Sequence, residues 1–99
     1  MEKDSAIPIQ HRTHGSHGEF FVEREGRRVA ELTYSLSGER AVVAHTWVDP
    51  TLRGAGMAPA LVDAAAQWAR DEHVKIVPVC SYVRAVFDRN PAYADVRKG

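Results

Sequence analysis

The feature that most constrains this chain is a change in the spacing of its apolar residues across positions 49–56. Before this segment, apolar residues alternate with polar ones, which is the period of a half-buried β-strand. After it, apolar residues recur at the spacing of a helical stripe, in the order Met57, Leu61, Ala64 and Trp68. The change predicts antiparallel strands followed by a helix that packs on them.

Three strands are expected before the change in spacing. The alternation begins at Phe20, and Glu25-Gly26 supplies a turn into a second strand over residues 29–36. Another short turn leads to a third strand over residues 41–48, which is rich in β-branched and aromatic residues. Strands joined by turns this short form an antiparallel meander.

The first helix is expected to begin within two or three residues of Gly56, because Pro59 is tolerated only in a first turn. It is expected to end near residues 70–73. A short apolar strand over residues 75–79 follows, and a helical crossover lays such a strand parallel to the preceding one. A second helix is expected over residues 81–88. The predicted fold class is α+β, with the order β-β-β-α-β-α and a mixed, mostly antiparallel sheet.

Both ends of the chain are expected to lie outside this fold. Residues 1–18 are polar, and we predict a flexible N-terminal tail followed by one domain over residues 19–99. The residues after the Asn90-Pro91 stop are expected to trail away. Metal sites need a rigid frame, which a tail does not offer. We therefore predict no metal site, although the tail has histidines at every third position, His11, His14 and His17.

Composition narrows the classes of partner. Thirteen basic residues balance thirteen acidic ones, so no net field attracts nucleic acid or anionic lipid. The sequence has no run near the ~20 apolar residues of a membrane span, and its start lacks the apolar centre of a secretory signal. A lone cysteine, Cys80, excludes an internal disulfide. We expect a cytoplasmic monomer or weak homodimer without a nucleic-acid or membrane partner.

The turn before the first helix has the chemistry of an anion site. Gly54 and Gly56 allow positive φ and close approach of the backbone to a bulky anion. The first N–H groups of the helix lack intrahelical partners, and the helix dipole adds partial positive charge there. Arg53 can add a bidentate bond to a phosphate oxygen. A turn that only reverses the chain remains the alternative, because glycine clusters are ordinary turn punctuation.

The segment RGAGMA, residues 53–58, fits the R/Q-x-x-G-x-G/A pattern of the GNAT (GCN5-related N-acetyltransferase) superfamily. The stretches HTWVDPTLRGAGMAPALV and KIVPVCSYVRAVFDRNPAYADV resemble the small, single-domain GNAT-like family of predicted acetyltransferases. The shared features are a histidine-threonine strand, the glycine loop, and a cysteine at the end of the next strand. The resemblance runs from Phe20 to Val96.

This resemblance implies a truncated GNAT fold in which the strand over residues 75–79 splays from the third strand. The V-shaped slot between them would hold acetyl-coenzyme A, the co-substrate. Loop amides would cradle its diphosphate, and the end of the third strand would bond its pantetheine arm. The implied cofactor-binding residues are Trp47, Val48, Arg53, Gly54, Ala55, Gly56, Met57, Ala58 and Tyr82. Relatives this short lack the N-terminal helices that shape the acceptor site in larger members.

Two side chains are candidates for the chemistry. Cys80 ends a strand and begins a helix, where the helix dipole favours a thiolate. The resemblance implies that Cys80 is catalytic, either as a transient acyl acceptor or as a proton donor. Histidine titrates near neutral pH, so His45, expected on the face of Val43 and Trp47, is a candidate base. The alternatives are a small buried cysteine and a packed structural histidine.

The function implied by the resemblance is transfer of acetyl from acetyl-coenzyme A to an amine. The acceptor is either a small molecule or a protein. A module that binds coenzyme A or acyl-coenzyme A with little or no turnover is the alternative, because the elements that shape the acceptor site are missing. A thiol sensor that acts through Cys80 alone is a third hypothesis.

Overall fold

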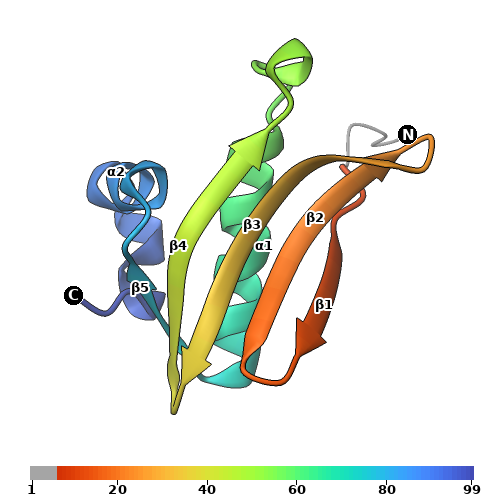
Figure 1. Cartoon of the computed structure of the whole chain (residues 1–99). Coiled ribbons are helices and arrows are strands. Elements are labelled where there is room, and N and C mark those ends of the chain that lie inside the picture. The colour runs from red at the N-terminus through yellow and green to blue at the C-terminus, as the bar shows by residue number, and fades with distance from the viewer. Residues whose placement is uncertain (1–6) are drawn as a thin grey trace.

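The computed structural model describes residues 7–99, which form a mixed five-stranded sheet with two α-helices. The strands lie side by side in chain order (Figure 1). β1 to β4 are antiparallel neighbours, and β5 runs parallel to β4. The predicted α+β class is therefore confirmed, with one strand more than expected. The elements are β1 Gln10–His14, β2 His17–Arg24, β3 Arg27–Ser37, β4 Arg40–Val48, η1 Pro50–Leu52, α1 Met57–Glu72, β5 Lys75–Pro78, α2 Ser81–Arg89 and η2 Pro91–Val96.

Helix α1 crosses one face of the sheet and supplies one side of the core (Figure 1). It begins directly after Gly56, whose φ of 83° suits a residue without a Cβ. It ends at His73, whose N–H donates to the carbonyls of the last helical turn. Both ends fall where the sequence predicted them. Within residues 7–99, no helix is long and apolar enough to cross a membrane.

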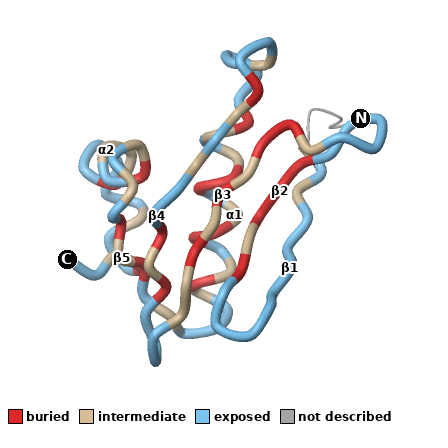
Figure 2. The backbone as a smooth tube through the Cα atoms, viewed as in Figure 1, coloured by how far each residue is buried: buried red, intermediate tan, exposed pale blue. Residues whose placement is uncertain are grey.

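Strand β1 corrects the prediction of a flexible tail over residues 1–18. It pairs with β2, although all five of its residues are exposed (Figure 2). The ring of His11 stacks on Phe20 with centroids 4.0 Å apart, and its Nε2 lies 2.6 Å from the Tyr34 hydroxyl. An edge strand held by backbone pairing and by the ring of one histidine needs no apolar alternation, so its sequence looks like a tail. The first part of the predicted tail, residues 1–6, lies outside the described residues.

The C-terminal segment also packs, contrary to the expectation that it trails away. Val96 of η2 is buried, and Arg70 of α1 donates to Asp95 at 2.7 Å. Ile76 of β5 forms a parallel bridge with Arg97. A short 3-10 helix shows no periodic apolar pattern in the sequence. Its proline lies at the first position of that helix and does not end the ordered part of the chain.

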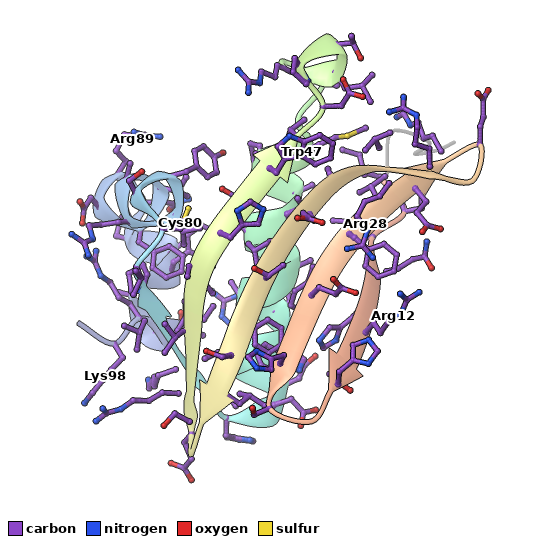
Figure 3. The ribbon with its side chains drawn as sticks, in the orientation of Figure 1. Arg12, Arg28, Trp47, Cys80, Arg89 and Lys98 are labelled. Atoms are coloured by element: carbon purple, nitrogen blue, oxygen red, sulfur yellow. The ribbon has the colours of Figure 1, made fainter. Side chains whose placement is uncertain are left out.

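The sheet face opposite α1, called the outer face below, is polar and held by charged pairs. Arg28 donates to Glu19 at 2.8 Å and to Glu31 at 3.1 Å, and Arg12 lies 3.8 Å from Glu19. The two guanidinium groups cover the ring of Phe21, which is why this outward-facing phenylalanine is buried. Figure 3 shows both arginines over this part of the sheet. Each cation–π contact is worth about 0.5–1 kcal/mol at an exposed site.

Asp49 fixes the direction in which the chain leaves β4. Its Oδ1 accepts the N–H of Thr51 at 2.9 Å and the Thr51 hydroxyl at 2.8 Å, and its Oδ2 accepts Arg27 at 3.0 Å. These bonds, those from Thr51 first, lower the pKa of the Asp49 carboxyl to about 2. The charged form is therefore favoured by the folded chain.

This depressed pKa makes a prediction for acid stability. The Asp49 carboxylate stabilises the fold fully above its unfolded pKa of about 4, and the contribution is lost as pH falls towards about 2. Chemical denaturation across this range should show Asp49→Asn less stable than the parent at neutral pH, with the gap closing below about pH 4. Asp71→Asn, at an exposed site on α1, is the control. A gap that stays constant down to pH about 2 would contradict the assignment.

Candidate functional site

The site begins where β4 and β5 stop pairing. β4 pairs with β5 only from Arg40 to Val43. The carbonyl of Val43 then accepts two N–H groups, from Val79 at 3.0 Å and from Cys80 at 2.9 Å. Beyond this point β4 continues to Val48 without a paired strand on that side, among the residues that the structure describes. This divergence is the expected V-shaped opening.

A β-bulge sets which side chains of β4 face the opening. Thr33 of β3 pairs with His45, whereas the next residue, Tyr34, pairs with Val43. Ala44 is therefore an extra residue, and it reverses the alternation of faces. His45 consequently lies on the outer face with Trp47, while Val43 points into the core. The prediction that His45 shares the face of Val43 is wrong, because a bulge cannot be read from alternation.

The opening contains a cavity of about 600 Å³. It brings together the end of β4, the glycine loop, the start of α1 and the start of α2. Of the residues expected to bind the cofactor, only Ala55 does not line it. The lining residues are Thr46, Trp47, Val48, Leu52, Arg53, Gly54, Gly56, Met57, Ala58, Pro59 and Tyr82.

One end of the cavity is a set of unpaired backbone donors. In the part of the chain that the structure describes, the N–H groups of Gly54, Gly56, Met57 and Ala58 donate to no carbonyl. Gly54 and Gly56 have φ values of 91° and 83°, a conformation that suits glycine, and both line the cavity. The exposed side chain of Arg53 lies beside these donors. Such a group of N–H donors at a helix N-terminus binds phosphate-like anions.

The rest of the wall is mostly apolar. Trp47 is 37% exposed although it is a large aromatic residue, and it lies near the end of β4 (Figure 3). Tyr82 approaches from α2, and its partial burial raises the pKa of its hydroxyl. Val48 and Leu52 complete the wall. An extended apolar chain with a polar end fits this combination of surfaces.

Cys80 lies between β4 and α2, beside the cavity (Figure 3). Its Sγ is 3.3 Å from the hydroxyl of Thr46, which lines the cavity. Burial alone raises the pKa of the Cys80 thiol. The hydrogen bond from the Thr46 hydroxyl, together with the nearby N–H groups of Val83, Tyr82 and Thr46, outweighs it, so the pKa lies below its usual range. A lowered pKa favours the thiolate form of Cys80, which is the nucleophilic form of a cysteine.

His45 is not brought to Cys80. Thr46, the next residue, pairs with Leu32 of the core face, so the two neighbours point to opposite sides of the sheet. The His45 imidazole instead lies 3.0 Å from the Glu31 carboxylate through Nε2. Because a carboxylate only accepts, Nε2 is the nitrogen that carries the proton in this contact. The described residues contain no cluster of three or more metal-ligating side chains.

Sequence reasoning missed the contacts that two residues of this site make. Thr46 was not expected to hold Cys80, because their contact depends on the register of two strands far apart in the chain. The pairing of Glu31 with His45 depends on the bulge. The sequence signal nearest to either residue is the alternation of β4, which places Thr46 and Val48 on one face.

Comparison with known proteins agrees with this geometry. The family model described as GCN5-related N-acetyl-transferase matches residues 19–96. A GCN5-like protein from Staphylococcus aureus, solved by NMR, is 26% identical with a TM-score of 0.74, over 94% of this chain and 89% of that one. No curated protein matches the chain.

More distant solved structures share the fold alone. A predicted acetyltransferase from Clostridium acetobutylicum, solved with acetyl-CoA, is 18% identical with a TM-score of 0.62, over 76% of this chain and 56% of that one. An aminoglycoside N-acetyltransferase in complex with CoA is 16% identical with a TM-score of 0.55, over 75% and 66%. The predicted truncated fold is thus confirmed.

The hydrogen bonds at Cys80 make a prediction for thiol reactivity. Replacing Thr46 with valine removes the hydroxyl donor and keeps the shape, so the pKa of the Cys80 thiol should rise. The rate of alkylation by iodoacetamide, measured against pH, should show its midpoint at higher pH in Thr46→Val. Thr46→Ser keeps the donor and should retain the parent's midpoint. Identical profiles for all three proteins would contradict this role of Thr46.

Proposed function

Because the chain belongs to the GCN5-related N-acetyltransferase family, we propose that it binds acetyl-coenzyme A in the cavity and transfers the acetyl group to an amine. The proposal rests on the groups that surround a single cavity. A group of unpaired N–H donors lies at the glycine loop, and a stabilised thiol lies beside the lining residue Thr46. The lining fits an anionic group joined to a long, weakly polar arm.

The glycine loop would hold the diphosphate. The N–H groups of Gly54, Gly56, Met57 and Ala58 can each donate to a phosphate oxygen without breaking a bond of the fold. Arg53 would add a charged donor at the exposed rim. The absence of Ala55 from the lining agrees with its N–H, which donates to the Leu52 carbonyl. We therefore assign no ligand contact to Ala55.

The open edge of β4 would hold the pantetheine arm. The N–H of Asp49 donates to Val29 of β3, and successive peptide groups in a strand point to opposite edges. The N–H and carbonyl of Val48 therefore point to the side without a paired strand. Val48 would supply the backbone contacts, while Trp47 would supply its ring. Trp47 and Val48, which the sequence analysis grouped as cofactor-binding residues, thus have different proposed roles.

Cys80 would act as a nucleophile. Acetyl-coenzyme A supplies a thioester whose carbonyl carbon is open to attack. The Cys80 thiolate would form a bond to that carbon as the bond to the coenzyme sulfur breaks. The coenzyme leaves as a thiolate, and an amine then displaces Cys80 and loses its proton to a base. The lowered pKa of the thiol favours this role over proton donation. We propose a small-molecule or protein amine as the acceptor and the cytoplasm as the setting.

The first prediction of this proposal concerns the loop. Arg53→Glu places a negative charge beside the diphosphate and removes a charged hydrogen bond worth about 1.5–3 kcal/mol. Isothermal titration should show acetyl-coenzyme A affinity falling by about tenfold to a hundredfold. Arg40→Glu, an exposed residue at the other end of β4, should bind as the parent does. Equal affinity in both variants would mean that the loop only turns the chain.

The second prediction concerns Cys80. Cys80→Ala should retain acetyl-coenzyme A affinity and lose acetyl transfer, because the side chain acts on the thioester and not on the diphosphate. Incubation of the parent with acetyl-coenzyme A should also place one acetyl group on Cys80, detected by peptide mass spectrometry. A parent that binds the cofactor without any turnover would be a binding module. Full turnover by Cys80→Ala would make the cysteine structural.

A further inference from the structure

The outer face of the sheet has a second pocket, of about 270 Å³. Its walls come from the β1–β2 hairpin and from β3, and its lining includes β4 residues on either side of the core residue Val43. His14 and His17 are direct cross-strand partners and both line it. Val42 and Ala44 also line it. At about 30 Å³ for each water, this volume would hold about nine waters. That volume suits a small molecule that carries an amine.

The pocket ends at the point where β4 and β5 separate. Ala44, the bulged residue, directly follows Val43, whose carbonyl holds the N–H of Cys80 at 2.9 Å. Thr33 lines the pocket and is the strand partner of His45. The pocket therefore reaches β4 beside Val43, which holds the Cys80 N–H, and it reaches the strand partner of His45. The bulged residue Ala44 thus lies between the pocket on the outer face and the backbone group that holds Cys80.

The charges around the pocket disfavour a polycation. Glu19, which lines it, already accepts Arg28 through both carboxylate oxygens at 2.8 and 3.3 Å. Arg28 also donates to Glu31, and Arg12 lies 3.8 Å from Glu19. The acidic charge is thus matched by basic charge. What remains on the wall are imidazole and hydroxyl groups, and the N–H of an imidazole can donate to a carboxylate.

We propose that this pocket binds the acceptor and that the acceptor is a small amine that carries a carboxylate, of the size of an amino acid. The inference rests on the proposed acetyl transfer. The carboxylate would accept hydrogen bonds from His14 and His17, and the amine would lie towards Ala44. There its nitrogen would bond the acetyl carbon of the Cys80 thioester as the C–S bond breaks; the sulfur leaves as a thiolate, and the proton that the amine loses passes to solvent.

The test is amide NMR mapping of the whole protein, alone and saturated with coenzyme A. Serine and β-alanine are the probes, ethanolamine lacks the carboxylate, and spermidine is the polycation. We expect saturable shifts at Gly18, Thr33 and Ala44 with the two amino acids only. The double variant His14→Asn, His17→Asn should bind them about tenfold more weakly, the loss of roughly one charge-assisted hydrogen bond. His73→Asn, at an exposed left-handed position that suits asparagine, is the control.

Each outcome decides the proposal. Shifts at these amides that weaken in the double variant, with acetyl-coenzyme A affinity unchanged by calorimetry, support it. Shifts elsewhere, a stronger response to spermidine, or no response to any probe in the parent overturn it. If these amides shift but the parent does not bind acetyl-coenzyme A, the proposed function has failed, and the acceptor role fails with it. Calorimetry with acetyl-coenzyme A identifies this case.

Discussion

The site depends on one carbonyl group, that of Val43. It accepts the N–H groups of both Val79 and Cys80, so it is the last bond between β4 and β5 and also the bond that places the thiol. Strand pairing before this point builds the core, and the lack of pairing after it leaves an edge of β4 open. A sheet interrupted in this way obtains a cleft without any additional element, which is how a chain of 99 residues can hold a site.

The parts that the sequence predicted correctly are those governed by local rules. The start of α1 follows from Gly56 and Pro59, because one needs a left-handed conformation and the other a first turn. The assignment of the glycine loop and Trp47 to one site came from the family resemblance and not from local sequence rules. The bulge at Ala44 was missed, since it is defined by pairing with β3 and leaves no mark in the alternation. β1 was missed because an edge strand held by His11 needs no apolar side chains.

The two faces of the sheet perform different tasks with the same strands. The face against α1 is apolar and is stabilised by burial, as the core residues of β3 and β4 show. The outer face is stabilised by Arg28, which bonds Glu19 and Glu31 and covers Phe21. Glu31 in turn holds His45 on the outer face. A polar sheet face without a covering helix can therefore remain ordered and still present functional groups to solvent.

The bulge has a consequence for how such chains can change in length during evolution. The interval from Val43 to Asp49 contains one extra residue, and that residue decides whether Thr46 or His45 faces the thiol. Losing or gaining one position there would exchange the two faces of the last part of β4. The hairpin turn at Gly38 lies at the opposite end of β4 from the cleft and is exposed, so insertions should be tolerated there. Length variation among descendants should gather in that turn and spare this interval.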